Sequence, residues 1–224
     1  MSEGPLELTD DMLAGDDPPP ERRVDFERGI SAGPFMTLFL LAACGLAFAW
    51  QHTQGGTDTV EAVLAQGAVA RQQVLQGQVW RLISASFLHG GIDHLLGNVM
   101  ALYVVGIAAE HAYGRWRFLG LFLLTGAAGW AASMAVREGP SLGASGAIFG
   151  ISGALVVFFR RYRDRYYLRD LRVGTVLLVW SGWQVAVCAL DPLVDNAAHV
   201  GGALGGALTA LVLPARARPE LPPG

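Results

Sequence analysis

Six apolar stretches are the feature that most restricts what this chain can fold into. All except the fourth approach the ~20 residues that an α-helix needs to cross the hydrocarbon layer of a membrane. Helices are favoured because every backbone polar group in lipid must be satisfied internally. The composition agrees, with 52% hydrophobic and only 16% charged residues. We therefore predict an all-α polytopic membrane protein with six transmembrane helices, at residues 34–51, 93–112, 116–136, 145–160, 173–190 and 197–213.

The arginines predict the orientation of these helices. The chain has 16 basic residues, and all of them are arginine. If the stretches alternate in direction, all but Arg71, Arg81 and Arg137 fall on one side of the membrane. The positive-inside rule then places both termini in the cytoplasm. The net charge of −3 gives no indication of nucleic-acid binding.

The chain divides into three parts. Residues 1–32 form an acidic, proline-rich tail that we expect to be cytoplasmic and disordered. Residues 33–213 form the six-helix membrane domain, and residues 214–224 form a short cytoplasmic tail. The first connection, 52–92, lies outside and is too polar to span the membrane. Its composition fits both a partly helical segment lying on the membrane and an ordinary exposed loop.

The fourth stretch is too short to cross the membrane. A helix from Ser145 to Phe159 is about 22 Å long, whereas the hydrocarbon is ~30 Å thick. With its arginine-rich end at the cytoplasmic face, this helix would begin roughly 10 Å below the outer surface. Residues 139–144 would have to descend to that depth, where non-helical backbone must be covered by protein or line a wet cavity. The short helix therefore predicts a water-filled pit with Ser145 at its floor.

Three other polar residues are predicted to lie at the same depth in the membrane as Ser145. His94 and Asn98 lie one turn apart at the start of the second stretch, and His199 lies near the start of the sixth. Polar residues inside spanning helices are costly and often functional. Each also has a simpler explanation. Ser145 fits a nucleophile, a helix N-cap or a small residue at a helix contact. Asn98 fits an interhelical hydrogen bond, His94 a residue at the membrane interface, and His199 a buried core histidine.

Two pairs of glycines bring the fourth and sixth stretches together. Gly146 and Gly150 are four residues apart, as are Gly202 and Gly206, and small residues at this spacing allow close helix packing. Such an approach would bring the Ser145 Oγ within ~3 Å of a ring nitrogen of His199. Packing and chemistry therefore predict the same arrangement.

Several short motifs occur in order along these stretches. They are Trp80-Arg81, Phe87-Leu88-His89, His94-x-x-x-Asn98, Gly106 with Glu110 and Gly114, Gly143-Ala144-Ser145-Gly146, and Ala198-His199-x-x-Gly202-x-x-x-Gly206. Because these motifs occur together and in this order, the chain resembles a rhomboid intramembrane serine protease of the basic six-helix bacterial type. The resemblance covers about residues 34–213 and leaves out the N-terminal tail.

The resemblance implies a function and a set of roles. It implies a serine endopeptidase in a bacterial plasma membrane that cleaves single-span membrane proteins near the outer face. Ser145 and His199 would form a catalytic dyad, with His94, Asn98 and the Ser145 N–H around the oxyanion. Arg81 and Glu110 would have structural roles.

Other consequences concern partners and one departure from the family. The partners implied are transmembrane protein substrates and membrane lipid, with no cofactor. No metal is required, because the histidines lack the His-Glu-x-x-His spacing of zinc proteases. Substrates would enter between the second and fifth stretches, where Trp180 and Trp183 would form part of a movable wall.

Phe149 stands where many relatives have a tyrosine against the histidine, so any hydrogen bond from that hydroxyl is lost.

Two other functions compete with proteolysis. A catalytically inactive rhomboid-like protein would only bind membrane proteins, which the retention of Ser145 and His199 argues against. A small transporter would carry polar groups along the whole pore and not only in its outer half. The remaining helices offer few such groups. From its place one turn before His199, we expect Asp195 to lie near the surface.

Overall fold

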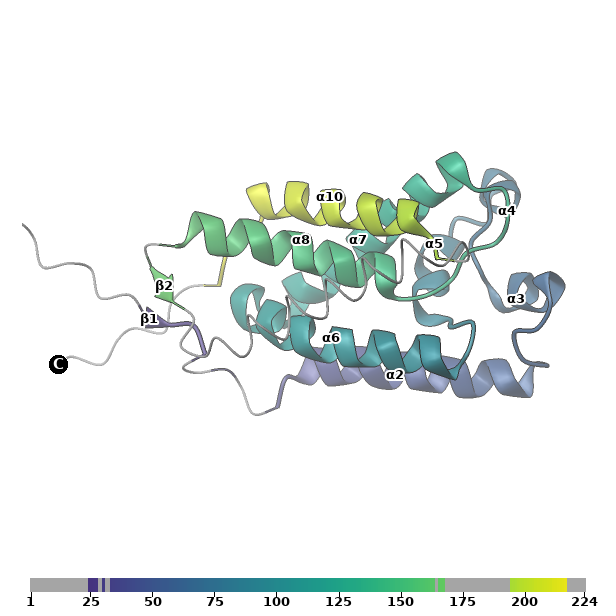
Figure 1. The fold of residues 1–224 in the computed structure, drawn as a ribbon, viewed down its shortest axis with the longest axis horizontal. Helices are drawn as coiled ribbons and strands as arrows, with labels where there is room; N and C mark the ends of the chain where they lie inside the picture. The colour runs from purple at the N-terminus through teal and green to yellow at the C-terminus, as the bar shows by residue number, and fades with distance from the viewer. Residues whose placement is uncertain (1–23, 28–29, 31–32, 164, 168–193, 217–224) are drawn as a thin grey trace, which may run out of the picture.

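The computed structural model describes residues 24–27, 30, 33–163, 165–167 and 194–216 (Figure 1). Within them the fold is a helical bundle with one pair of two-residue strands. The long helices are α2 (Phe35–Thr53), α6 (Ile92–Tyr113), α7 (Arg115–Val136), α8 (Ser145–Arg161) and α10 (Asn196–Val212). The short ones are α3 (Val60–Gln66), α4 (Arg71–Leu75), α5 (Arg81–Ser84) and the 3-10 turn η1 (Ala85–Phe87).

The five long helices coincide with five of the six apolar stretches. The expected fifth span, 173–190, lies outside the described residues, as do Trp180 and Trp183. Of the described helices, α2, α6 and α7 are each long and apolar enough to cross a membrane. The helix α8 has 17 residues, about 25 Å, and is shorter than α6 and α7, which have 22 each.

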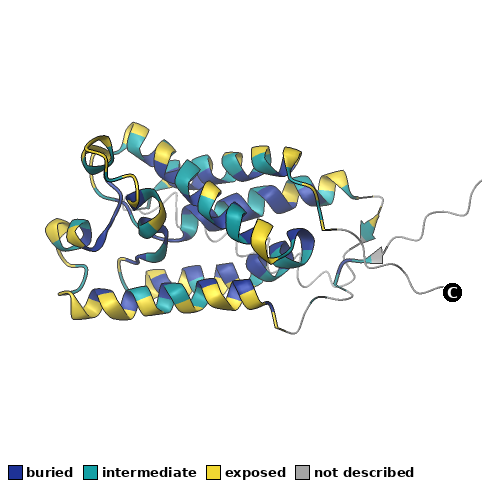
Figure 2. Cartoon of the chain, turned by 180° about the vertical axis from the view of Figure 1, so that it is seen from behind, coloured by how far each residue is buried: buried dark blue, intermediate teal, exposed yellow. Residues whose placement is uncertain are grey.

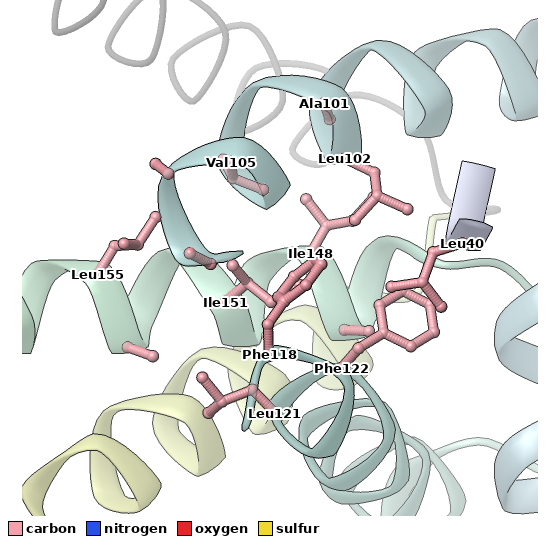
Figure 3. Packing of buried hydrophobic residues seen from close by; sticks show 14 of the residues in the cluster. Leu40, Ala101, Leu102, Val105, Phe118, Leu121, Phe122, Ile148, Ile151 and Leu155 are labelled. Atoms are coloured by element: carbon pink, nitrogen blue, oxygen red, sulfur yellow. The ribbon is translucent and has the colours of Figure 1, made fainter. Parts of the chain in front are cut away.

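The hydrophobic core lies where α6, α7 and α8 meet. Ile148 and Ile151 of α8 are fully buried, and Figure 3 shows them facing side chains of α6 and α7 such as Val105 and Phe118. The outward faces are apolar too. Figure 2 shows exposed positions along the long helices, and these include Leu46 and Met100. A bundle that is apolar inside and outside is what a lipid environment requires.

The helices α8 and α10 pack backbone against backbone. A β-carbon on Gly202 would overlap the carbonyl oxygen of Gly146, and one on Gly206 would overlap that of Gly150. The two glycine pairs therefore do bring these helices together, and we call this contact the glycine seam. In Figure 1, α8 and α10 lie side by side along most of their length.

The chain between α2 and α6, residues 54–91, forms a compact segment at one end of the bundle (Figure 1), which we call the outer connection after its predicted side of the membrane. It is partly helical, and several of its apolar side chains are exposed, including Leu75 and Trp80. Arg81 is only 6% exposed in the middle of this connection. Its Nη1 donates to the carbonyls of Leu64 at 2.7 Å and Ala68 at 2.8 Å, so one guanidinium joins α5 to the end of α3.

Glu110 joins α6 to the start of α2. Its carboxylate accepts the backbone N–H groups of Met36 and Thr37, at 3.0 and 2.8 Å, and the Thr37 hydroxyl at 2.8 Å. These N–H groups have no partner within the helix, and a carboxylate there also interacts favourably with the helix dipole. Arg81 and Glu110 thus make the structural contacts that the resemblance implied.

The opposite end of the bundle holds part of the expected N-terminal tail. Strand β1 (Val24–Asp25) pairs in parallel with β2 (Tyr166–Tyr167) after α8. Phe26 is 2% exposed and packs edge-on against Phe159 and His111, with ring centroids 4.9 Å apart in each case. A single aromatic side chain therefore anchors this segment to the bundle.

Candidate active site

Ser145 and His199 are in direct contact. The His199 Nε2 lies 2.8 Å from the Ser145 Oγ, a normal hydrogen-bond distance. Ser145 is the first residue of α8 and His199 lies in the first turn of α10, so the glycine seam brings together the two helix ends that carry them. His199 is buried and Ser145 is partly exposed.

The serine occupies the positive end of a helix. The first backbone N–H groups of α8 have no partner in the helix itself; its first intrahelical bond runs from the Ile148 N–H to the Ala144 carbonyl, 3.0 Å long. These groups and the helix dipole favour negative charge beside Ser145. The geometry therefore suits a reaction in which an oxyanion forms next to the serine.

Phe149 supports the histidine ring. The rings of Phe149 and His199 stack with centroids 4.4 Å apart and planes inclined by 17°. Phe149 is one turn after Ser145, so α8 supplies both the hydroxyl and the surface on which the histidine rests. The aromatic contact expected at this position is present without a phenol.

His94 faces the loop that leads to Ser145. Gly143 has a φ of +130°, and a β-carbon there would lie 2.8 Å from the His94 Nε2. The His94 Nδ1 accepts the Gly90 N–H at 3.4 Å. A neutral ring that accepts at Nδ1 carries its hydrogen on Nε2, so this nitrogen is a donor directed at the serine loop.

Asn98 points its amide into the same space. Its side chain is buried, and Nδ2 makes no hydrogen bond to any described residue. The same β-carbon on Gly143 would lie 3.7 Å from this nitrogen. A buried donor without a partner is costly, and such groups often serve a ligand or a reacting atom. The structure thus brings the four predicted residues to one end of α6, α8 and α10.

His89 is a polar residue near the site whose contacts the sequence did not indicate. Its ring is fully buried, 5.3 Å from that of His94 between centroids, and its backbone N–H donates to Gln51 Oε1 at 2.9 Å. Burial, with a smaller contribution from His94, lowers the pKa of His89 to about 3. The ring is therefore neutral at physiological pH and unsuited to exchange protons there.

Asp195 has hydrogen-bond partners that the sequence did not indicate. It caps α10 by accepting the Ala198 N–H at 3.0 Å, and its other oxygen accepts hydroxyls of Ser133 and Ser141. The aspartate is half-buried and engaged with three donors. Among the described residues, no group of three histidine, cysteine or acidic side chains is arranged to hold a metal ion.

Known proteins resemble the chain across this region. The Rhomboid domain family matches residues 76–216. Rhomboid protease GluP of Bacillus subtilis is 38% identical over 182 residues, 80% of this chain and 35% of that protein. RHOMBOID-like protein 5 of Arabidopsis thaliana is 36% identical over 150 residues, 66% of this chain and 48% of its own length. Rhomboid protease AarA of Providencia stuartii is 32% identical over 174 residues, 65% of this chain and 59% of that protein. The chain thus spans between about a third and three fifths of the length of these relatives.

Proposed function

We propose, from the fact that this chain belongs to the rhomboid family of intramembrane proteases, that it is a serine endopeptidase cleaving single-span membrane proteins. The observation that carries the proposal is the 2.8 Å contact between the Ser145 Oγ and the His199 Nε2. A nucleophile within hydrogen-bond reach of a base is the signature of covalent catalysis. Two of the relatives, from Bacillus subtilis and Providencia stuartii, are themselves named rhomboid proteases.

The reaction would proceed through an acyl-enzyme. His199 takes the Ser145 proton as the Oγ attacks the scissile carbonyl, and then gives it to the leaving amine. A water molecule repeats the sequence on the ester and releases the second product. Stacking on Phe149 holds the imidazole in place throughout, since the ring centroids are only 4.4 Å apart.

Three donors would stabilise the tetrahedral oxyanion. These are the His94 Nε2–H, the Asn98 amide and the backbone N–H of Ser145. The nitrogens of His94 and Asn98 converge beside Gly143, and the Asn98 Nδ2 is a buried donor with no acceptor among the described residues. In comparable sites each donor contributes about 3–4 kcal/mol to transition-state stabilisation.

Substrate selection would follow from backbone physics. A spanning helix satisfies all its peptide groups internally, so a substrate must unwind locally before Ser145 reaches a carbonyl. Glycine or β-branched residues near the substrate's outer end favour that unwinding. The small residues around Ser145, Gly143, Ala144 and Gly146, favour a small residue such as alanine before the scissile bond. Entry would be sideways, as the resemblance implies, and the expected fifth span on that side lies outside the described residues.

The setting of the site completes the proposal. The chain is an integral membrane protein, and its arginine distribution supports both termini in the cytoplasm of a bacterial cell and the site near the outer face of the plasma membrane. Water would reach Ser145 through a pit open to that face. The partners are transmembrane substrates and lipid.

Cleavage of single-span substrates in liposomes tests the proposal. Wild type should cut an alanine substrate with a glycine-containing helix well, and a phenylalanine substrate or a stiff poly-leucine helix poorly. Ser145→Ala and His199→Ala should each abolish cleavage, and the double variant should be no worse, because the pair acts as a unit. Asn98→Ala should lower kcat by up to ~10²–10³ with little change in KM.

Two outcomes would refute parts of this account. Substantial cleavage by Ser145→Ala would eliminate this serine as the nucleophile. Binding of substrate by wild type without any cleavage would instead favour an inactive rhomboid-like protein that only binds membrane proteins.

A further inference from the structure

The carboxylate of Asp195 connects three separate segments beside the serine and histidine. One oxygen accepts the Ala198 N–H of its own helix at 3.0 Å. The other accepts the Ser141 hydroxyl at 2.7 Å and the Ser133 hydroxyl, and these two hydroxyl oxygens are 3.2 Å apart. Each serine has one hydroxyl hydrogen, so a carboxylate oxygen that accepts both leaves neither of these two hydroxyls without an acceptor.

Each partner of Asp195 belongs to a segment that borders the site. Ser133 lies in the last turn of α7, and Ser141 lies in the loop four residues before Ser145. The backbone of Ser141 pairs with Val69 of the outer connection through two hydrogen bonds of 2.8 and 3.0 Å. Both serines are buried, so their hydroxyls are shielded from water as alternative partners.

The glycine seam alone does not control the first turn of α10. His199 is the fourth residue of α10, three residues before Gly202, where the seam begins. The first turn also packs on its neighbours at Ala198, whose carbonyl faces Gly129 and Gly146. Helix ends open locally at low cost, because their last backbone groups have fewer partners. The Asp195 contacts act at this end, one turn before His199.

We propose that Asp195, with Ser133 and Ser141, forms a clamp that positions His199 against Ser145. This inference rests on the proposed function. Asp195 is a positioning residue, because it holds the start of the histidine helix to the serine loop and touches neither reacting atom. Without the clamp, the bundle stays folded while the first turn of α10 shifts relative to the loop.

A variant separates the clamp from ordinary helix capping. Serine is as good an N-cap as aspartate, so Asp195→Ser keeps the bond to the Ala198 N–H. Its single short hydroxyl cannot also reach Ser133 and Ser141. Ser133→Ala/Ser141→Ala breaks the same contacts from the opposite side and leaves the cap intact. Glu138→Gln removes an exposed carboxylate from the neighbouring loop and serves as the matched control.

The experiment measures kcat and KM for an alanine substrate in liposomes, at a temperature where circular dichroism shows every variant folded. Asp195→Ser and the double serine variant should each lower kcat by about tenfold or more with KM within about twofold, because small misplacements of reacting groups have large effects. Combining all three substitutions should lower kcat no further. Glu138→Gln should match wild type.

Hydrogen–deuterium exchange on the same proteins provides a readout that does not depend on catalysis. Both clamp variants should raise the exchange of amides 196–199, and Glu138→Gln should not. If these amides respond but wild type cleaves nothing, the clamp stands and the proposed function fails. Unchanged kcat in Asp195→Ser, or effects of the two variants that multiply, would overturn the clamp.

Discussion

The glycine seam and the outer connection hold the chain together in opposite ways. In the seam, α8 and α10 meet with no side chain between them at Gly146, Gly150, Gly202 and Gly206. In the outer connection, residues 54–91 have a small apolar core and are fastened by buried polar side chains. Arg81 binds two carbonyls there, and Gln51 of α2 binds both Gln66 and the backbone of His89.

The difference reflects how accurately each region must be placed. Two backbones in contact leave no room for adjustment, since even one methyl group would overlap a carbonyl oxygen. Hydrogen bonds from long side chains tolerate small shifts of the segments that they connect. The rigid contact lies directly behind Ser145 and His199, and the adjustable one lies in the connection beside the site.

The seam predicts the largest effect of a single methyl group. Gly206→Ala should lower kcat/KM by about 10² or more, because the displaced α10 moves His199 away from Ser145. The matched control is Gly120→Ala on α7, where a β-carbon meets no described atom within 4 Å. Alanine is the better helix former by about 1 kcal/mol, so the control should be neutral or stabilising.

Cleavage rates and thermal unfolding in detergent would measure both variants. Equal activity of Gly206→Ala and Gly120→Ala would mean that the seam does not set the geometry of the pair.

Arg81 predicts the reverse pattern, a large effect on stability and a smaller one on chemistry. Arg81→Gln removes charged hydrogen bonds to the carbonyls of Leu64 and Ala68, each worth about 1.5–3 kcal/mol. We expect the midpoint of unfolding to fall while kcat, measured on folded protein, changes by less than about fivefold. Arg71→Gln, at an exposed position of the same connection, is the control. A catalytic loss without any loss of stability would contradict this division of roles.

The smallest effect should come from a single polar contact between the outer connection and α7. Ser86→Ala removes the acceptor of the Trp130 Nε1–H, a buried bond of 2.9 Å. Leaving that donor unpaired should cost about 1–3 kcal/mol of unfolding free energy and leave kcat unchanged. In the control, Ser152→Ala, the lost hydroxyl bonds only its own helix at the Ile148 carbonyl. Equal stability of the two variants would show that the Trp130 contact is energetically unimportant.

The sequence was sufficient for features that depend on periodicity and spacing. Apolar length located the five described long helices, and glycines four residues apart predicted the contact between α8 and α10. That contact, with the position of each residue in its helix, predicted that Ser145 and His199 would meet. These are consequences of helix geometry and backbone hydrogen bonding in lipid.

Features that depend on hydrogen-bond partners distant in sequence were missed. Asp195 binds Ser133 and Ser141, which lie 62 and 54 residues away in the sequence. Gln51 and Phe26 are similar cases, in which one buried side chain fastens a distant segment. No periodic pattern marks such contacts, because they depend on the tertiary path of the chain.

The central claim is that the glycine seam makes Ser145 a nucleophile by placing His199 beside it. The most direct test is the rate and site of modification by a serine-directed fluorophosphonate, read by mass spectrometry. We predict one adduct, on Ser145, in wild type, and modification at least about 10²-fold slower in both His199→Ala and Gly206→Ala, with Gly120→Ala labelled like wild type. An adduct on another serine, or equal labelling of Ser145 in all four proteins, would contradict the account.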